Sequence, residues 1–428
     1  MTTTVDARTA RTALACLTEP GSETVYRLVR EHGPVKALGR VLAGEAAGDA
    51  ERALVESARV RLGSAGPDRI VDAALARTRR VGARIVTPED DEWPAQLADL
   101  ALIAQPGGDR IARDTFPPIC LWVRGERPLA GAFARSVAVV GARAATSYGS
   151  HVATELAFGL ANRGWTVVSG GAYGIDAAAH RGALAASGLT AVVLACGVDR
   201  PYPAGHAGLF ERIAEEGLLI SEWPPGAEPH RHRFLVRNRV IAALTRGTIM
   251  VEANARSGAR QTLGRATLLG RSPMTVPGPV TSAMSIGCHE AIRGGARLVT
   301  SYQEVLEEVG LVGDDLAPPV RGPERESDRL GQALARIVDA VPRRGGLDPG
   351  QIAASAGVPL REVLRALPTL EQLGHVLMKD DGRYVLAPRP RTGPDAAAEP
   401  YVSTGPDGAE ASAPDADAAG ASATGAAP

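Results

Sequence analysis

Residues 136–143 read Ser-Val-Ala-Val-Val-Gly-Ala-Arg, a short apolar run that stops at a glycine and an arginine. Further runs of this kind follow it, separated by helix-like segments. They are Trp165–Ser169, Thr190–Cys196, Leu218–Ser221, Thr248–Glu252 and Pro273–Val276. Fully apolar strands between helices are typical of a parallel sheet buried on both faces. The sequence therefore predicts a doubly wound α/β domain, Rossmann-like in its architecture.

The segments between these runs have the length and apolar spacing of helices. We expect helices at His151–Arg163, Ala177–Ser187, Ala207–Glu216, Asn238–Thr245 and Arg260–Leu269. Upstream, residues 6–80 also have helical spacing, with breaks near Gly21 and Gly33. The stretch from Ala83 to Val123 predicts a mixed connector with two short apolar runs, Ala83–Val86 and Ile119–Val123.

Composition divides the chain further. We expect a small helical domain at 1–80, an extended Rossmann-like domain at 81–312, a linker at 313–326, a winged helix at 327–388 and a disordered acidic tail at 389–428. The winged helix is predicted from three helical segments followed by a hairpin at Asp381-Gly382. Its recognition helix carries arginines and glutamates that cancel, and Pro368 is expected to interrupt it. This pattern favours an accessory or protein-contact role over reading of duplex DNA.

Charge is strongly segregated along the chain although the net charge is only −1. Between Pro225 and Ser272 there are nine arginines against Glu228 and Glu252, whereas the tail is acidic. A basic segment of this kind permits a polyanionic partner, so charge must be considered for each domain separately.

The four cysteines lie far apart and form no metal-ligand pattern, which indicates free thiols in a reducing cytoplasm. No leader-like or membrane-spanning stretch is evident, and we expect a cytoplasmic protein.

Glycine-rich loops follow three of the predicted strands. They are Gly141–Gly149, Ser169–Asp176 and Ser257–Arg260. Such loops gather at the carboxyl edge of an open α/β sheet, where backbone N–H groups and helix N-termini bind anions. An arginine adds a forked cationic donor that matches phosphate. We therefore expect a phosphate site at this edge, against the alternative that the glycines only permit tight turns.

The kind of phosphate ligand is a separate question. Ser169-x-Gly171-x-x-Gly174, with Asp199 after the next strand, is close to a dinucleotide fingerprint and leaves open a nucleotide-binding enzyme. The fingerprint lacks its first glycine, however, and no catalytic motif accompanies it. Arg237-Asn238-Arg239, interpreted as the opening of a helix, instead favours the repeating phosphates of single-stranded DNA. Phe234, Tyr173 or Trp223 is available for base stacking, although each could equally be a core residue.

We assign the phosphate site to a defined set of residues and expect no catalytic residue, cofactor or metal. The site residues are Arg143, Thr146, Ser169, Gly170, Gly171, Gly174, Phe234, Arg237, Asn238, Arg239, Ser257 and Gly258. Asp176, His180 and Asp199 are expected to support it, Asp176 as a helix cap and His180 by packing.

Six ordered motifs in the central region resemble the DprA/Smf DNA-processing family. They are VVGARxxTxYG ending at Gly149, SGGAxGIDxxAH ending at His180, GxDxxYP ending at Pro203, SExPPG ending at Gly226, RNRxI ending at Ile241, and Pro277-Gly278. The resemblance covers about Val81 to Thr300. The helical N-terminus, of SAM/HhH type, and the winged helix fit the family's three-part layout more loosely.

The resemblance implies a non-catalytic homodimer that binds and protects incoming single-stranded DNA and loads RecA recombinase onto it during natural transformation of competent cells. Arg143, the Gly170-Gly171 loop and Arg237/Arg239 match the family's DNA-site motifs. The sequence departs from the family at Leu235, where proline is usual, at Ala259–Gln261, and at His289, where asparagine is common.

Overall fold

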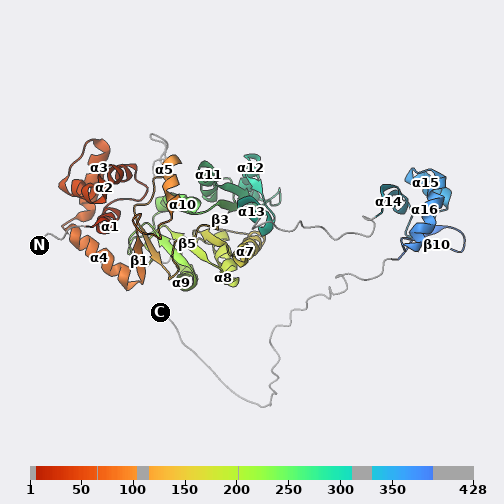
Figure 1. Cartoon of the computed structure of the whole chain (residues 1–428), viewed down its shortest axis with the longest axis horizontal. Coiled ribbons are helices and arrows are strands. Elements are labelled where there is room, and N and C mark those ends of the chain that lie inside the picture. The colour runs from red at the N-terminus through yellow and green to blue at the C-terminus, as the bar shows by residue number, and fades with distance from the viewer. Residues whose placement is uncertain (1–5, 65, 104–114, 201, 311–329, 389–428) are drawn as a thin grey trace, which may run out of the picture. The chain divides into compact units, whose positions relative to one another are not determined.

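The computed structural model describes residues 6–64, 66–103, 115–200, 202–310 and 330–388 (Figure 1). The chain divides into two units, Met1–Pro318 and Pro319–Pro428, and each is described by itself. The predicted linker at 313–326 and the predicted tail at 389–428 lie outside the described residues.

A nine-stranded sheet forms the centre of the first unit, in the order β1-β2-β6-β5-β4-β3-β7-β8-β9. Its strands are β1 Ala83–Val86, β2 Leu121–Arg124, β3 Ser136–Val140, β4 Thr166–Ser169, β5 Thr190–Leu194, β6 Leu218–Ser221, β7 Gly247–Met250, β8 Ser272–Thr275 and β9 Arg297–Leu298. All pairs from β6 to β9 are parallel. Each of the six predicted apolar runs is a strand, which confirms the doubly wound α/β prediction.

The predicted connector is part of this sheet. β1 and β2 pair antiparallel with each other, and β2 pairs antiparallel with β6. Trp122 and Val123 of β2 are fully buried. The connector prediction is therefore wrong for these two runs, because they extend the sheet and cover the edge that β6 would otherwise expose.

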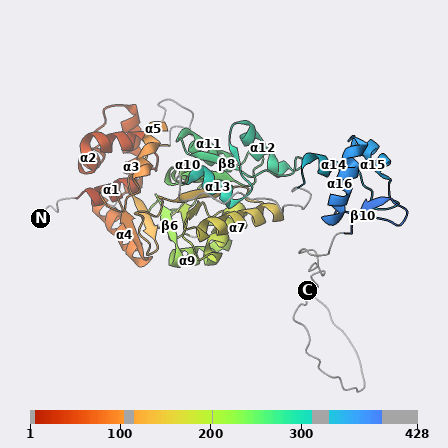
Figure 2. The same ribbon diagram turned by 45° about the vertical axis from the view of Figure 1, so that its right-hand side comes forward.

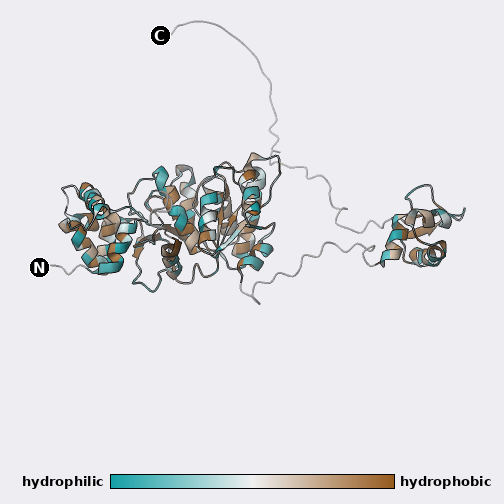
Figure 3. Cartoon of the chain, turned by 90° about the horizontal axis from the view of Figure 1, so that it is seen from above, coloured by the Kyte–Doolittle hydropathy of each residue, from teal (hydrophilic) through white to brown (hydrophobic). Residues whose placement is uncertain are grey.

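Helices cover both faces of the sheet (Figures 1 and 2). The described helices of this unit that follow β1 are η1 Ala95–Asp99, α5 Leu100–Ile103, α7 Ser147–Asn162, α8 Ile175–Ala185, η2 Ala204–His206, α9 Ala207–Glu216, α10 Arg231–Leu244, α11 Ala259–Leu268, η3 Ala283–Ser285, α12 Ile286–Arg293 and α13 Tyr302–Val309. Successive strand residues point to opposite faces. Ala138 and Val140 accordingly pack with α10 and α11, whereas Val137 and Val139 pack with α7 and α8. Figure 3 shows hydrophilic and hydrophobic residues alternating around these helices, as expected for elements with one buried face.

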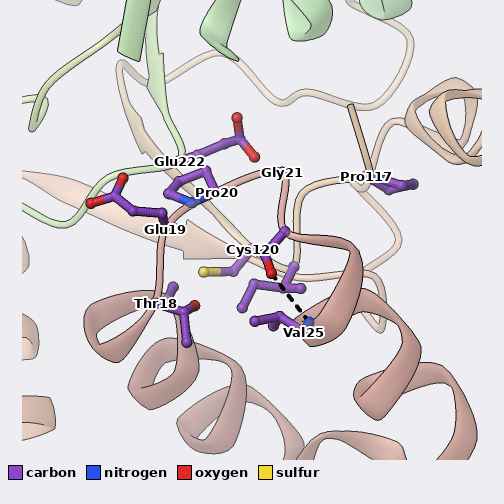
Figure 4. A pocket seen from close by; sticks show the side chains of 11 residues that line it. Thr18, Glu19, Pro20, Gly21, Val25, Pro117, Cys120 and Glu222 are labelled. Carbon is purple, nitrogen blue, oxygen red and sulfur yellow. Dashed lines mark hydrogen bonds between the residues drawn. The ribbon is translucent and has the colours of Figure 1, made fainter. Parts of the chain in front are cut away.

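Four helices precede the sheet: α1 Ala7–Leu17, α2 Glu23–Ala43, α3 Asp49–Leu62 and α4 Pro67–Arg80. Gly33 interrupts α2 with a φ of 77°, as the predicted break requires. This helical segment packs against the sheet, because Ala15 shares a core cluster with Trp122 and the Trp122 indole N–H donates to Thr78 Oγ1 (3.1 Å). A cavity of about 20 Å³ lies at the junction, between Thr18 and Glu222 among others, and is large enough for one water (Figure 4).

Glu19, beside this cavity, ties the helical segment to the start of α10 (Figure 4). Its carboxylate accepts hydrogen bonds from Arg233 Nη2 (2.8 Å), from the Trp223 indole N–H (3.1 Å) and from Arg61 Nη2 (2.5 Å). Burial acts to raise the pKa of Glu19, but Arg233, Trp223 and Arg61 hold it below the ordinary value. The carboxylate is therefore charged at neutral pH and fixes the chain just before and within the first turn of α10.

A buried ion pair fixes the middle of the same helix. Arg239 is fully buried, and its two terminal nitrogens donate to the two carboxylate oxygens of Glu222 at 2.8 and 2.7 Å. Glu222 directly follows β6 and is 3% exposed. The pair therefore attaches α10 to the carboxyl end of a central strand by a bidentate, charge-assisted contact.

The second unit contains α14 Gln332–Asp339, α15 Pro349–Ala356 and α16 Leu360–Gln372, followed by the hairpin strands β10 Val376–Met378 and β11 Tyr384–Leu386. Three helices and a hairpin are the predicted winged-helix arrangement. The prediction that Pro368 interrupts the third helix is wrong. The helix continues through it, because Val363, Leu367 and Leu370 hold one face in the core.

We expect Glu222→Ala to lower the free energy of unfolding by about 3–5 kcal/mol, because it leaves the Arg239 charge buried without its partner. Urea denaturation followed by circular dichroism measures the change. Glu228→Ala is the matched control, since Glu228 is exposed and pairs only with Arg200 in the described part of the chain, and it should change stability by less than about 1 kcal/mol. Equal effects of the two substitutions would contradict a structural role for the pair.

Candidate nucleic-acid interface

A cleft of about 700 Å³ opens at the carboxyl edge of the sheet. Its walls come mainly from the loop after β3, the first half of α10, and the segment from Asn254 to Thr262 that follows β7 and opens α11, with single residues from the loops after β4 and β5. Six of the predicted site residues line it: Arg143, Phe234, Arg237, Asn238, Ser257 and Gly258. The structure thus brings together three segments that lie far apart in the sequence, at the carboxyl edge of the sheet, where loops after parallel strands gather.

Phe234 stands at the centre of this group. The guanidinium carbon of Arg143 lies 5.3 Å from its ring centroid, and that of Arg237 lies 6.0 Å away. Arg143 is exposed and forms no ion pair with any residue in the described part of the chain. A cation over a ring face is attracted by the ring quadrupole. Arg143 is therefore positioned by Phe234 with its donors left available to a ligand.

Arg237 is 5% exposed and binds the ends of two strands. Its Nη1 donates to the carbonyl of Gly170 (3.0 Å) and to that of Val193, and its Nε donates to Asn238 Oδ1 (3.1 Å). Burial lowers the pKa of Arg237 to about 10, so the side chain remains cationic at neutral pH. A Cβ at position 170 would lie 2.4 Å from Arg237 Nη2, so a larger residue there would displace the guanidinium from these contacts.

The glycine loop after β4 reaches the cleft only through Ala172 and Asp176 in the described part of the chain, and its predicted phosphate-binding glycines do not line it. One carboxylate oxygen of Asp176 accepts the N–H groups of Gly170 (3.1 Å) and Ala172 (3.3 Å). Ser169 Oγ donates to the carbonyl of Val139 (2.6 Å) in the neighbouring strand. Burial raises the pKa of Asp176. An internal carboxyl group thus takes the amides that a phosphate of a dinucleotide would need.

The two remaining glycines of this loop serve its conformation. Gly171 has a φ of 70° and packs on Phe210, and Gly174 has a φ of 77° and approaches the carbonyl of Ala142. Both backbone conformations favour glycine. The loop therefore has a structural role next to the cleft. The structure does not bring four of its predicted site residues to the cleft wall: Ser169, Gly170, Gly171 and Gly174.

Thr146 also serves the scaffold. Its hydroxyl caps α7 by accepting the N–H of Gly149 (3.1 Å) and donates to Glu252 Oε1 (2.6 Å), while its N–H donates to Glu252 Oε2 (2.9 Å). These bonds join the loops after β3 and β7. Thr146 thereby holds the loop that carries Arg143 and is not itself part of the cleft lining.

The prediction for Arg239 is wrong. The apolar helix was expected to open at Asn238, with the arginines at its N-terminus, but α10 begins at Arg231, shortly after Pro229. Arg237 and Arg239 consequently lie in its interior and point away from solvent, and Arg239 serves the pair with Glu222. A helix that is buried on nearly all sides offers no phosphate-facing stripe along its middle.

Two exposed cations of the cleft are absent from the assigned set. Arg231 lies in the first turn of α10, and Arg256 lies in the loop after β7; both line the cleft. The described lining contains four arginines, with Arg143 and Arg237 included, against the single carboxyl group of Asp176. The basic run at 230–233 could have indicated Arg231 as a site residue. For Arg256 the sequence offered no such indication beyond its place between Asn254 and Ser257.

Asp199 and His180 lie outside the cleft and form hydrogen bonds within the domain that carries it. Asp199 Oδ1 accepts the N–H of Gly226 (2.7 Å), which joins two loops at the carboxyl edge. His180 is fully buried, and its Nδ1 lies 2.7 Å from Thr190 Oγ1. That hydroxyl donates to the carbonyl of Val167, so the histidine nitrogen is the donor to it. Burial, with the charges of His206 and Arg237, lowers the pKa of His180 to about 3 and keeps the ring neutral.

Other kinds of site have little support in the described residues. Among them, no group of three His, Cys, Asp or Glu side chains is placed to hold a metal ion. Burial raises the pKa values of Cys16, Cys120, Cys196 and Cys288, which makes these thiols poor nucleophiles. None of the described helices is both long enough and apolar enough to span a bilayer.

Comparison with known proteins gives consistent matches. A family model described as DNA recombination-mediator protein A matches residues 84–310, which include the whole cleft. A DprA DNA processing protein of Mycobacterium tuberculosis is 45% identical over 372 residues, which are 87% of this chain and 92% of that protein. Protein Smf of Escherichia coli is 33% identical over 317 residues, covering 72% of this chain and 79% of that one. The X-ray structure of DNA processing protein A from Streptococcus pneumoniae matches with a TM-score of 0.54 and 29% identity, over 70% of this chain and 96% of that chain.

The buried neutral His180 makes stability depend on pH. The unfolded chain takes up a proton near the ordinary histidine pKa of 6.5, whereas the folded protein does so only near 3. The contribution of His180 to the free energy of unfolding is therefore fully present above pH 6.5 and is lost as the pH falls towards 3. From pH 7 to pH 5 we expect this residue to remove about 2 kcal/mol from the free energy of unfolding.

His180→Asn retains a side-chain N–H donor and cannot titrate, so it is the matched variant for this prediction. Urea denaturation at pH 7 and pH 5 should show a smaller loss on acidification for the variant than for the unaltered protein. The same loss in both proteins would assign the acid sensitivity to other groups.

Proposed function

Because the chain belongs to the DNA recombination-mediator protein A family, we propose that its arginine-lined cleft binds single-stranded DNA as part of DNA processing. The observation that carries the proposal is Arg143 held over Phe234 at the mouth of an acid-poor cleft. A guanidinium takes a phosphate, and an aromatic ring takes a base that is free of its duplex partner. The two kinds of group lie side by side, as a single strand needs.

A polymer fits this cleft better than a small nucleotide does. The four arginines come from three segments around an opening of about 700 Å³, so they offer cations to several successive phosphates. α10 also begins with no acidic residue in its first turn and no side-chain cap, which leaves its positive dipole end unopposed beside Arg231. The amides of the fingerprint-like loop, in contrast, are occupied by Asp176. Binding should therefore be sequence-tolerant and salt-dependent.

The finer parts of the function rest on the family resemblance. We propose that the protein works as a homodimer in the cytoplasm, protects incoming single strands and helps to load RecA recombinase onto them in natural transformation. We also propose that it binds DNA without catalysing a reaction on it. The names of its relatives in Mycobacterium tuberculosis and Streptococcus pneumoniae, which describe DNA processing proteins, support this assignment.

The proposed division of labour follows the domains. Residues 81–312 would bind DNA, the helical segment at 1–80 would support the cleft through Glu19, and the winged helix at 327–388 would have an accessory role. The contacts of Glu19 with Arg233 and Trp223 support the second of these assignments.

Arg143→Ala should weaken binding of a labelled oligothymidylate because it removes one cationic contact with phosphate. A titration at several salt concentrations should show affinity falling about tenfold and the slope of log K against log [salt] decreasing by about 1. Arg163→Ala is the matched control, since Arg163 is an exposed arginine at the opposite end of α7. If Arg143→Ala binds as tightly as the control, with the same salt slope, the cleft is not the DNA site.

The alternative of a nucleotide-binding enzyme predicts a different outcome. Since Asp176 holds the loop amides, we expect NAD, ATP and nucleoside monophosphates to leave the thermal midpoint unchanged within about 1 °C, whereas oligothymidylate raises it. A ligand at 100 times its Kd stabilises by about 2.7 kcal/mol, which a thermal-shift measurement detects easily. A stabilisation of this size by NAD or ATP would favour the enzyme and count against the strand-binding proposal.

A further inference from the structure

Aromatic side chains are scarce in this chain, at 4% of residues, and three tyrosines among them are exposed at the carboxyl edge of the sheet. Tyr148 is 44% exposed and follows β3, Tyr173 is 49% exposed and follows β4, and Tyr202 is 43% exposed and follows β5. These strands are neighbours in the order β5-β4-β3. Large aromatic rings gain free energy by burial, so rings left open on adjacent strand ends call for a ligand explanation.

One of these tyrosines lines the cleft, and a second lies beside the segment that follows it. The ring of Tyr202 lies 5.4 Å from that of Phe234, at an interplanar angle of 52°, and Tyr202 is itself a lining residue. Three residues further on, Gly205 approaches the hydroxyl of Tyr173, where an added Cβ would lie 2.5 Å from it. The Tyr173 ring packs edge-on against His206 at 4.5 Å. Phe234 and Tyr173 thus both contact the short segment 202–206, which itself carries Tyr202, and we call these three residues the aromatic row.

The three exposed tyrosines differ in the hydrogen bonds of their hydroxyl groups. Tyr148 donates to the carbonyl of Pro277 (2.7 Å), which gives that side chain a structural role. Neither Tyr173 nor Tyr202 forms a hydrogen bond through its hydroxyl within the described part of the chain. Their rings are held by aromatic contacts on one side and remain open on the other. Such half-supported rings are suited to stacking against a planar partner.

We propose that Tyr202 and Tyr173 form a second, base-stacking part of the DNA site that takes the bases next to the one at Phe234. This inference rests on the proposed function and deepens it. The phosphates stay with Arg143 and its neighbours, and the bases lie on the row of rings. Stacking on tyrosine accepts any base because every base has a π face, but it requires bases that are not paired in a duplex. The row would therefore select single strands without reading their sequence.

The test compares two probes of equal length: an oligothymidylate and an oligomer of the same backbone with abasic sites. Tyr202→Ala and Tyr173→Ala should each weaken binding of the oligothymidylate by about tenfold, within the range measured for loss of a base–aromatic stack. Binding of the abasic oligomer should be unchanged in both variants, and the salt slope should stay at the unaltered value because no phosphate contact is lost. Tyr202→Phe and Tyr173→Phe should bind like the unaltered protein.

Phe158→Ala is the matched control, since Phe158 is 39% exposed on α7 and lies outside the cleft. Three results would overturn the stacking row. The alanine variants could lose equal affinity for the two probes, the phenylalanine variants could lose as much affinity as the alanine variants, or no variant could lose affinity. If Arg143→Ala weakens binding while the tyrosine variants do not, this inference fails and the proposed function stands. If the unaltered protein binds neither probe, the proposed function itself fails.

A crosslinking measurement gives an independent readout. An oligothymidylate with one 5-iododeoxyuridine, irradiated in complex with the full chain, should attach to the peptides that contain Tyr173 or Tyr202. Crosslinks confined to other parts of the chain would contradict the proposed path of the bases.

Discussion

The ion pair between Arg239 and Glu222 is the contact on which the cleft depends. It attaches α10 to the end of β6, and Arg237, two residues earlier, attaches the other side of the same helix to the ends of β4 and β5. Residues two apart on a helix point roughly 200° away from each other. The two arginines therefore hold α10 from opposite sides. Its first turn, with Arg231 and Phe234, opens into the same cleft that Arg237 lines further along the helix.

Much of this fold could be predicted from the sequence, because an apolar run between helices has few alternatives to a buried parallel strand. The same pattern places the loops after β3 and β7 at one edge of the sheet, where both line the cleft. The error at Arg239 has a physical origin: a charge in a sequence does not state its exposure, and its partner Glu222 lies 17 residues away. Apolar residues on both sides of the Arg-Asn-Arg triplet were the usable signal, since they indicate a helix buried on all faces. β1 and β2 were missed because two short runs separated by a long segment carry no pairing information.

Asp176 explains why a loop so close to a dinucleotide fingerprint belongs to a different kind of site. The fingerprint works by leaving amides free at a helix N-terminus. Here the first turn of α8 supplies its own acceptor, and the amides of Gly170 and Ala172 are satisfied before any ligand arrives. The loop then gains a different use, since the carbonyl of Gly170 accepts from Arg237 and draws α10 against the sheet. The exposed cations of the described cleft lining are instead Arg143, Arg231 and Arg256, which is where we propose that anions bind.

The difference between buried and exposed arginines determines which ligands suit the cleft. A guanidinium buried among carbonyls, as in Arg237, contributes charge but few free donors, so it raises the local potential without fixing one phosphate in place. Exposed Arg143, which lies over the ring of Phe234, forms no ion pair within the described part of the chain. A site with a fixed buried charge and adjustable outer cations holds a flexible backbone of repeating charges better than a single rigid phosphate. The aromatic row adjacent to it adds affinity only for bases that are already unpaired, so the same edge of the sheet couples charge recognition to strandedness.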